Sequence, residues 1–395
     1  MTVTMDEDRL LREQFVHVIE QNIQLSSAVR AAFLAVPRIL FVPQYYARND
    51  QTFKWTLMSA EAANVYRDDA LVTQIDARGM PSSSSSQPSL MAEMLEALAI
   101  QPGQRVLEIG TGTGYNAALL AHITGDALLV TTVELDPELA DKARDALEQV
   151  GYGSIQVSIS NGLQGYAPRA PYDRIIATGG YPYVPGPWID QLAIGGKLVM
   201  DLLLPLSYGL VALDKQPDRV ATGHFLAKTR VGFIQLRDED MLQPSPRPVR
   251  IQTYLSQPLL TEEEVQPDEI DTTVFDDPTF LFYLQLEYPH LEMKYLGTPE
   301  NAPAFTKYLF DLNTLTGMIC PSDQHDPQSV WRVEARGQYN LWEAVKAAYH
   351  CWENLKRPVL SEYRMEVDAQ ARQSILLGSQ RWIMREGQCG KIKSS

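Results

Sequence analysis

The sequence predicts an α/β fold built on a doubly wound parallel sheet, and three observations support this prediction. Apolar strand-like runs alternate with amphipathic helical stretches between residues 105 and 202. A glycine-rich turn joins the first of these strands to its helix. An acidic residue ends the second strand, where it can reach a ligand bound at that turn. Together these features are typical of a domain that binds a nucleotide cofactor.

The elements can be assigned in order along the chain. Residues 6–40 indicate two helices, because apolar side chains recur on one face of each, and we expect them to cover the sheet. Residues 45–80 show little periodicity and lead into a run of five serines and an apolar helix over 90–98. The alternation follows, with strands at 105–109, 128–134, 155–159, 172–177 and 197–202, and helices at 115–123, 137–150 and 188–192. We expect two later strands, 224–229 and 232–236, to close the sheet as an antiparallel pair.

A proline-rich stretch at 242–249 predicts a boundary between two domains, 1–240 and 250–395, because closely spaced prolines exclude regular structure. In the second domain, residues 341–355 place their apolar side chains on one helical face, and Pro358 ends the helix. Alternating apolar residues at 363–367 predict a strand. We therefore expect an appended C-terminal α+β domain.

Composition narrows the functional class. The 395 residues are 45% hydrophobic and 21% charged, which is ordinary for a globular protein of two domains. The formal net charge of −15 repels phosphate backbones and argues against a nucleic-acid substrate. The N-terminal residues lack the basic and apolar regions of a signal peptide, and the most apolar run, 198–206, is too short to cross a membrane. We expect a cytoplasmic protein with no membrane partner.

Cysteine and histidine give no clear metal signal. The three cysteines, Cys320, Cys351 and Cys389, form no C-x-x-C pair and fit a reducing compartment. The segment 320–325 brings a cysteine, an aspartate and a histidine together but lacks the two-pair spacing of a zinc site, so a surface loop is the better interpretation. We expect no metal.

The turn after the first strand carries glycines at every second position, Gly110, Gly112 and Gly114. Glycine lets the chain turn sharply out of a sheet and lets backbone N–H groups approach a ligand with no Cβ in the way. A helix starts at Tyr115, so a ligand in the turn also meets the unpaired N–H groups of a helix N-terminus. The pattern predicts a nucleotide-cofactor loop, with a chance glycine-rich turn as the alternative.

Two glutamates bear on which cofactor it is. Glu134 ends the next predicted strand, where its carboxylate can accept hydrogen bonds from both hydroxyls of a ribose. A dinucleotide would also fit, but its loop has the spacing G-x-G-x-x-G, whereas this chain has G-x-G-x-G. Glu108, just before the turn, suits an aminoacyl cation and would repel a pyrophosphate. We therefore expect S-adenosylmethionine.

Four stretches together resemble the protein-L-isoaspartate O-methyltransferases. They are AAFLAVPR at 31–38 with FVP at 41–43, SSSQPSLMA at 84–92, VLEIGTGTGYNAA at 106–118, and PYDRII at 171–176 with GGKLV at 195–199. The resemblance spans roughly residues 8 to 237. It implies the class I S-adenosylmethionine-dependent methyltransferase fold, a Rossmann-like sheet with N-terminal helices, and methyl transfer to a carboxylate of a protein or peptide.

The resemblance also implies site residues. A serine two positions before a proline binds the acceptor carboxylate in this family, and here that serine is Ser86, or Ser85 if the register within the serine run differs by one; a flexible linker is the alternative for this run. Where the family has Asp-Gly near the adenine, this chain has Asn-Gly. The expected cofactor residues are Glu108, Gly110, Thr111, Gly112, Gly114, Tyr115, Glu134, Leu135, Asn161 and Gly162.

The C-terminal extension shapes the functional hypotheses, because repair enzymes of the family are expected to end near residue 237. Extended relatives resemble methyltransferases encoded beside ribosomally made peptides of the lanthipeptide and graspetide kinds. The leading hypothesis is therefore methylation of an Asp side chain in a cyclised ribosomal peptide, which leads to an aspartimide and isoaspartate. A repair enzyme acting on isoaspartate is the first alternative, and a non-catalytic cofactor-binding scaffold is the second.

Overall fold

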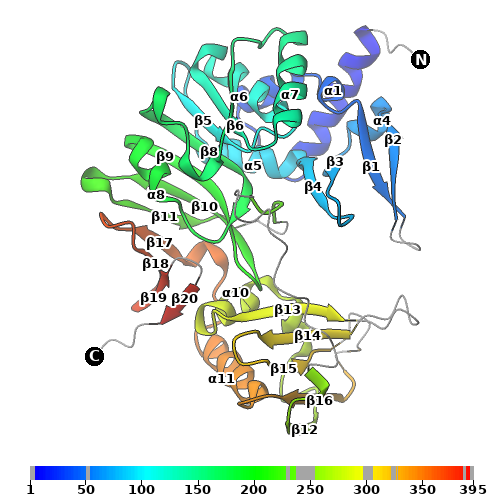
Figure 1. The fold of residues 1–395 in the computed structure, drawn as a ribbon, viewed down its shortest axis with the longest axis vertical. Helices are drawn as coiled ribbons and strands as arrows, with labels where there is room; N and C mark the ends of the chain where they lie inside the picture. The colour runs from blue at the N-terminus through cyan, green and yellow to red at the C-terminus, as the bar shows by residue number, and fades with distance from the viewer. Residues whose placement is uncertain are drawn as a thin grey trace.

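The computed structural model describes residues 5–49, 54–227, 232–236, 254–296, 306–321, 326, 328–385 and 388–391. These residues form three sheets and the helices packed on them (Figure 1). An upper part holds the N-terminal helices and the parallel strands, and a lower part holds a smaller sheet with two helices. No helix within these described ranges has both the length and the hydrophobicity needed to cross a membrane.

The largest sheet has eleven strands in the order β20-β19-β18-β17-β11-β10-β9-β8-β5-β6-β7. Strands β5 to β9 pair in parallel, and the remaining pairs are antiparallel. The parallel part confirms the doubly wound fold class. The strands are β5 (Val106–Ile109), β6 (Val130–Glu134), β7 (Gln156–Ile159), β8 (Tyr172–Tyr181), β9 (Leu192–Leu203), β10 (Tyr208–Lys215), β11 (Ala221–Phe225), β17 (Arg364–Val367), β18 (Gln373–Leu377), β19 (Gln380–Arg385) and β20 (Gln388–Lys391).

Both faces of this sheet are covered, because neighbouring residues of a strand point to opposite sides. On β9, Leu198 and Met200 belong to one hydrophobic core, whereas Val199 belongs to the other. The N-terminal helices, α5 and α6 pack in the second core, and α8, α10 and α11 pack in the first. The helices of the upper part are α1 (Met5–Glu20), α2 (Ser27–Ala35), α3 (Arg38–Phe41), α4 (Ala62–Val65), α5 (Pro88–Leu98), α6 (Tyr115–Thr124), α7 (Pro137–Gln149) and α8 (Gly186–Gln191).

Local sequence explains where the helices beside the parallel strands begin. Asp136 caps α7 by accepting hydrogen bonds from the backbone N–H groups of Glu138 and Leu139, and Pro137 occupies the first turn. Gly114 precedes α6 with a φ of 83°, a conformation that favours glycine. The helix starts predicted for these two segments are confirmed.

Residues 45–80 differ from the prediction. The expected aperiodic stretch forms most of a four-stranded antiparallel sheet in the order β2-β1-β3-β4, with β1 (Gln44–Arg48), β2 (Trp55–Ser59), β3 (Leu71–Ile75) and β4 (Pro81–Ser85). Its side chains are mostly half-buried or exposed, so burial imposes little alternation of apolar and polar residues on the sequence. The five serines belong to this sheet and the turn after it, and the linker interpretation is wrong.

The closing antiparallel pair also differs from the prediction. It consists of β10 and β11, with Val211 opposite Phe225, instead of segments 224–229 and 232–236. Gly232–Leu236 lies beside β8, where Gly180 donates its N–H to the carbonyl of Ile234 and accepts from the N–H of Leu236. The buried side chains Leu210, Val211 and Leu213 make β10 a core strand that the prediction had missed.

The lower part of the molecule is a five-stranded antiparallel sheet in the order β12-β16-β15-β14-β13, with α11 packed on it and α10 packed beside α11 (Figure 1). Asn340 caps α11, and the predicted helix over 341–355 is confirmed. Its elements are β12 (Leu259–Val265), η6 (Thr272–Asp276), α10 (Pro278–Glu287), β13 (Leu291–Leu296), β14 (Thr306–Asp311), β15 (Thr316–Ile319), β16 (Trp331–Arg336) and α11 (Leu341–Asn354).

The last strands of the chain return to the large sheet. Strand β17 pairs with β11, and the ring of Phe282 lies with its centroid 5.0 Å from the centroids of both Phe225 and Tyr363. The predicted boundary at 242–249 lies outside the described residues. Residues from both of the proposed domains, 1–240 and 250–395, contribute strands to the eleven-stranded sheet and side chains to one hydrophobic core.

Candidate functional site

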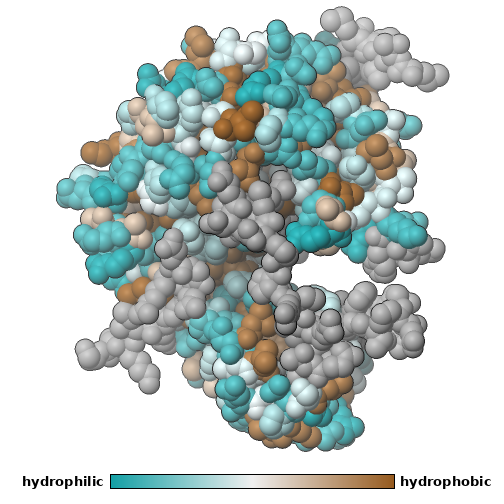
Figure 2. Space-filling view, in the orientation of Figure 1, coloured by the Kyte–Doolittle hydropathy of each residue, from teal (hydrophilic) through white to brown (hydrophobic). Residues whose placement is uncertain are grey.

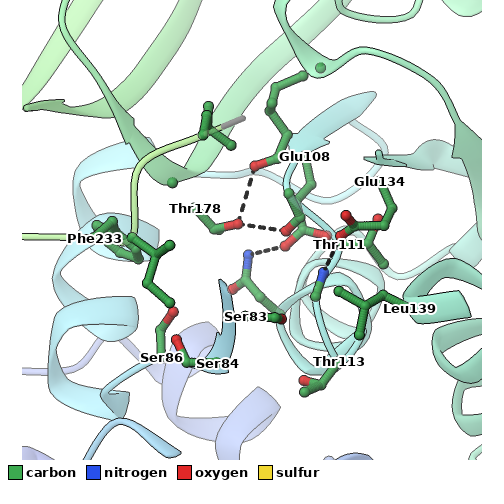
Figure 3. Close-up of a pocket in the computed structure, with 18 of the residues that line it drawn as sticks. Ser83, Ser84, Ser86, Glu108, Thr111, Thr113, Glu134, Leu139, Thr178 and Phe233 are labelled. Carbon is green, nitrogen blue, oxygen red and sulfur yellow. Dashed lines mark hydrogen bonds between the residues drawn. The ribbon is translucent and has the colours of Figure 1, made fainter. Parts of the chain in front are cut away.

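A pocket opens at the carboxyl ends of β5, β6 and β8. Ligands of open α/β sheets bind at this edge, outside the carboxyl ends of the parallel strands. Two sides of the pocket face each other. The glycine wall consists of the lining residues within 108–116 and 133–135, and the serine wall consists of residues 82–86 and 233–236. Figure 3 shows Glu134 and Thr111 on the first side, and Ser84, Ser86 and Phe233 together on the second.

The three glycines of the turn have different surroundings. A Cβ on Gly110 would lie 2.9 Å from Oγ1 of Thr178, a hydroxyl that donates to the carbonyl of Gly110 itself at 2.6 Å. A Cβ on Gly114 would lie 3.2 Å from the Cβ of Ala143, so this glycine permits close packing of α6 on α7. Gly112 faces the serine wall, and a Cβ on it would lie 3.5 Å from the carbonyl oxygen of Ser84. Of the three, Gly110 and Gly112 line the pocket.

Glu134 is 8% exposed and holds the turn in place. Its carboxylate accepts hydrogen bonds from the backbone N–H groups of Gly112 (2.9 Å), Leu135 (2.9 Å) and Asp136 (3.1 Å). A carboxylate offers about four acceptor positions, so the three contacts leave capacity for a further donor. Leu135 also lines the pocket beside Glu134.

Glu108 is fully buried at the base of the glycine wall. Its two oxygens accept from Nδ2 of Asn116 (2.7 Å) and Oγ1 of Thr132 (2.6 Å), and the hydroxyl of Thr132 lies 2.7 Å from that of Thr111. Burial raises the pKa of Glu108 to about 7, because it penalises the charged form. This carboxyl group is thus held in a network and is near its titration point at neutral pH.

Asn116 supplies an acceptor next to this carboxyl group. Its side chain is 8% exposed, and Oδ1 has no hydrogen-bond partner among the described residues. Buried polar atoms are normally paired, so an orphaned oxygen in a pocket wall indicates a position for a ligand donor. An ammonium group would supply such a donor and would also favour the charged form of Glu108.

The remaining predicted cofactor residues are Tyr115, Asn161 and Gly162. Tyr115 lines the pocket and also packs against Phe33 and Phe41, and burial raises the pKa of its hydroxyl. Gly162 lines the pocket, and its carbonyl accepts from Nε1 of Trp188 at 2.8 Å. Asn161 is not among the described lining residues; its side chain accepts from the N–H of Leu163. At this end of the pocket the wall therefore consists of Gly162 and Leu163.

The serine wall is built on β4, an edge strand of the four-stranded sheet. Alternation along the strand buries Ser83 and Ser85, and the hydroxyl of Ser85 accepts from Nε of Arg38 at 3.2 Å. Ser86 follows the strand and lies with Ser84 beside Phe233 (Figure 3). All the serines of the run line the pocket, but Ser85 is engaged with the arginine behind it.

Arg38 is a site residue that the sequence analysis did not assign. It is fully buried, and its guanidinium group donates six hydrogen bonds, to Oγ of Ser85 and to the backbone carbonyls of Val65, Arg67, Asp69, Ser85 and Ser86. Burial lowers the pKa of Arg38 to about 10, so it remains charged at neutral pH. An arginine directly after Pro37 in an apolar segment was the one signal in the sequence, because buried arginine requires partners.

Asp201 positions the other half of the serine wall. Its Oδ2 accepts from the backbone N–H of Phe233 at 2.9 Å, and Oδ1 has no partner among the described residues. Burial raises the pKa of Asp201 to about 6. The sequence analysis placed this residue inside a core strand and did not assign it to the site.

The segment 320–325 was considered as a metal site in the sequence, and its Asp323 and His325 lie outside the described residues. Cys320 is buried, and burial raises its thiol pKa. Within the ranges that the structure does describe, no three His, Cys, Asp or Glu side chains are grouped closely enough to hold a metal ion.

Comparison with solved structures relates the fold to known proteins over nearly the whole chain. A solved structure titled protein-L-isoaspartate O-methyltransferase has a TM-score of 0.55 and 23% sequence identity, and the match covers 93% of this chain and 99% of that one. At this identity the likeness shows the fold alone. Because the match covers 93% of this chain, the likeness in fold extends past residue 237 into the C-terminal region.

Sequence comparison places the first region. A protein from Methanoculleus marisnigri named protein-L-isoaspartate O-methyltransferase is 40% identical over 197 residues, covering 49% of this chain and 77% of that protein. One of the same name from Ignicoccus hospitalis is 33% identical over 231 residues, which are 58% of this chain and 98% of that protein. The family model described as protein-L-isoaspartate(D-aspartate) O-methyltransferase matches residues 11–240, more than half of the chain. The chain belongs to the protein-L-isoaspartate O-methyltransferase family.

Proposed function

We propose that this protein is an S-adenosylmethionine-dependent carboxyl O-methyltransferase that esterifies isoaspartyl residues of proteins and peptides. The observation that carries the proposal is that the glycine wall and the serine wall face each other across one pocket. One wall offers a carboxylate and backbone groups to a nucleoside, and the other offers hydroxyls to a carboxylate. The family match over residues 11–240 supports the isoaspartyl acceptor.

The residues of the glycine wall fit S-adenosylmethionine. Glu134 keeps acceptor capacity for ribose hydroxyls, and the orphaned Oδ1 of Asn116 beside Glu108 suits the ammonium group. Gly162 and Leu163 would lie against the adenine. When bound, the cofactor supplies a methyl group on a positively charged sulfur.

The serine wall would position the acceptor instead of activating it. A carboxylate is already ionised at neutral pH, so methyl transfer needs orientation more than a general base. Among the described residues that line the pocket there is no lysine or arginine, and the charge of Arg38 is directed to the carbonyls behind Ser85 and Ser86. We infer that the hydroxyl of Ser86 orients the acceptor carboxylate without neutralising it.

The methyl ester makes the later rearrangement of the isoaspartyl residue possible. Methoxide leaves an ester far more readily than oxide leaves a free carboxylate. In an isoaspartyl residue the next backbone nitrogen is bonded to the β-carbonyl, so this nitrogen attacks the carbonyl carbon of the esterified α-carboxyl group. A ring closes as methanol departs with the amide proton, and water then opens the ring to aspartate or isoaspartate. Only the methyl transfer requires the residues of this pocket.

The sequence analysis favoured a different acceptor, a normal Asp of a cyclised ribosomal peptide, and this remains a second candidate. The C-terminal region suggested it, but the same fold over 93% of the chain occurs in a protein titled protein-L-isoaspartate O-methyltransferase. The family match therefore supports the repair alternative better. A non-catalytic scaffold is the least supported, because the contact between Glu134 and Gly112 is intact.

The test offers the purified protein three peptides with cofactor labelled on its methyl group: a linear isoaspartyl peptide, its normal aspartyl twin, and a cyclised peptide with a normal Asp. We expect label in the first peptide only. Label confined to the cyclised peptide, followed by loss of methanol in the mass spectrum, would favour peptide modification. A Glu134→Ala variant serves as the control for cofactor-dependent labelling.

A further inference from the structure

A second cavity lies between the upper and lower parts of the molecule. It is an open groove of about 1220 Å³, above the roughly 300–1,000 Å³ of small-molecule pockets. Residues of α5 and of the turn between β9 and β10 line one side, and residues of η6, α10 and β13 line the other. Figure 1 shows α5 in the upper part and α10 and β13 in the lower part, and in the space-filling view hydrophobic side chains are exposed on the lower part where it faces the upper one (Figure 2). The size suits a polypeptide segment.

The groove and the acceptor site share the turn that leads from β4 into α5. Ser86 lines the pocket described above, and Gln87 and Ser89, the next residues along the turn into α5, line the groove. We propose that the groove binds the stretch of substrate polypeptide that adjoins the acceptor residue. The inference rests on the proposed function, because it takes the serine wall as the acceptor site.

The walls of the groove indicate which polypeptide it prefers. Met293 and Tyr295 project from β13, the edge strand of the lower sheet, and Tyr295 is 54% exposed. Residues two apart on a strand share a face, so these side chains form an apolar strip along the groove. An exposed aromatic ring of this kind suits contact with the side chains of an extended peptide.

The charges in the groove are mainly negative. Glu93, Asp276 and Asp277 line it, whereas Lys307 is 2% exposed and paired with Asp276. The formal net charge of −15 adds to this negative potential. The groove therefore favours a substrate stretch that carries lysine or arginine with apolar residues, and disfavours an acidic one.

The experiment compares three isoaspartyl peptides: a minimal one, and two longer ones that carry either lysines or glutamates beside the acceptor. At low ionic strength we expect a KM about three-fold lower for the lysine peptide than for the glutamate peptide, and a smaller difference at high salt. Asp277→Asn, which removes the charge and keeps a side chain able to cap α10, should raise the KM for the lysine peptide about two-fold relative to the minimal peptide. Tyr295→Ala should raise the KM of both longer peptides relative to the minimal one.

Glu148→Gln, an exposed charge change on α7 away from the groove, is the matched control. Fluorescence anisotropy of the labelled longer peptides measures binding without turnover, so a failed methylation assay would refute the proposed function while the groove is still tested. Equal affinity for the lysine and glutamate peptides in every variant would overturn the inference. The groove would then belong to another segment of this chain or to a second copy.

Discussion

The two walls of the pocket are held by interactions that span different lengths of chain, up to 24 residues in the glycine wall and 32 or 48 residues in the serine wall. In the glycine wall, Glu134 bonds to Gly112 and to its own chain neighbours, and Glu108 bonds within the same strand-turn-helix unit and the next strand. In the serine wall, Ser86 and Phe233 are held by Arg38 and Asp201, which come from distant parts of the chain. The contacts of the glycine wall lie within one strand-turn-helix-strand motif, so this wall can be inferred from the sequence motif. The serine wall forms only when segments from several parts of the chain come together in the fold.

The largest effect on stability should come from a substitution that disrupts the serine wall. Arg38→Met removes six hydrogen bonds and leaves buried carbonyl groups unpaired, so we expect a loss of at least about 3 kcal/mol in the free energy of unfolding. Urea denaturation measures it. Arg30→Met is the control, because Arg30 is exposed and pairs only with Glu20, and it should change stability by less than about 0.5 kcal/mol. Equal losses in the two variants would contradict the role of Arg38.

The glycine wall should respond to pH. Because the pKa of Glu108 is raised from 4.5 to about 7, the folded protein keeps a proton that the unfolded chain has lost between these values. The stability from this group is fully present below pH 4.5 and is lost as pH rises through 7, by as much as about 3 kcal/mol. Without cofactor, Glu108→Gln should flatten this decline in thermal denaturation.

Asp201 contributes in the same direction, since its pKa is raised from 3.8 to about 6. Asp201→Asn is therefore the comparison variant, and it should remove the decline at lower pH than Glu108→Gln does. If Glu108→Gln leaves the pH dependence between 4.5 and 7 unchanged, the carboxyl group is not buried as described.

Glu134→Ala should test whether the glycine wall binds the cofactor. It removes the acceptor for Gly112 and the proposed acceptor for ribose, so we expect cofactor affinity to fall about 30-fold, which corresponds to about 2 kcal/mol. Isothermal titration calorimetry measures the Kd. Glu138→Ala, an exposed change in the first turn of α7, is the control. An unchanged Kd for Glu134→Ala would refute the cofactor assignment.

The smallest predicted effect distinguishes neighbouring serines. Ser86→Ala should lower kcat/KM for an isoaspartyl peptide about ten-fold while the cofactor Kd stays unchanged, because one orienting hydrogen bond is lost. Ser85→Ala should instead lower stability, since its hydroxyl accepts from Arg38. The opposite pattern would show that the acceptor site is shifted by one residue.

The parallel strands, α7 and α11 could be predicted because their signals lie within a few turns of chain: caps, glycines and apolar periodicity. The turn with Gly112 and Glu134 was recognisable for the same reason. Residues 45–80 were missed because their partly exposed strands carry no alternation. Arg38 and Asp201 were missed because a buried charge is identified by partners far away in sequence.

The order in which the sheet is completed has a consequence for folding. Strand β11 pairs with β17, which follows about 140 residues later in the chain. During synthesis the N-terminal region emerges first, so β11 presents an unpaired edge until nearly the whole chain has been made. Unpaired edges invite association with other chains. Solubility of the nascent protein should therefore depend on its C-terminal strands, although the pocket residues are all synthesised well before them.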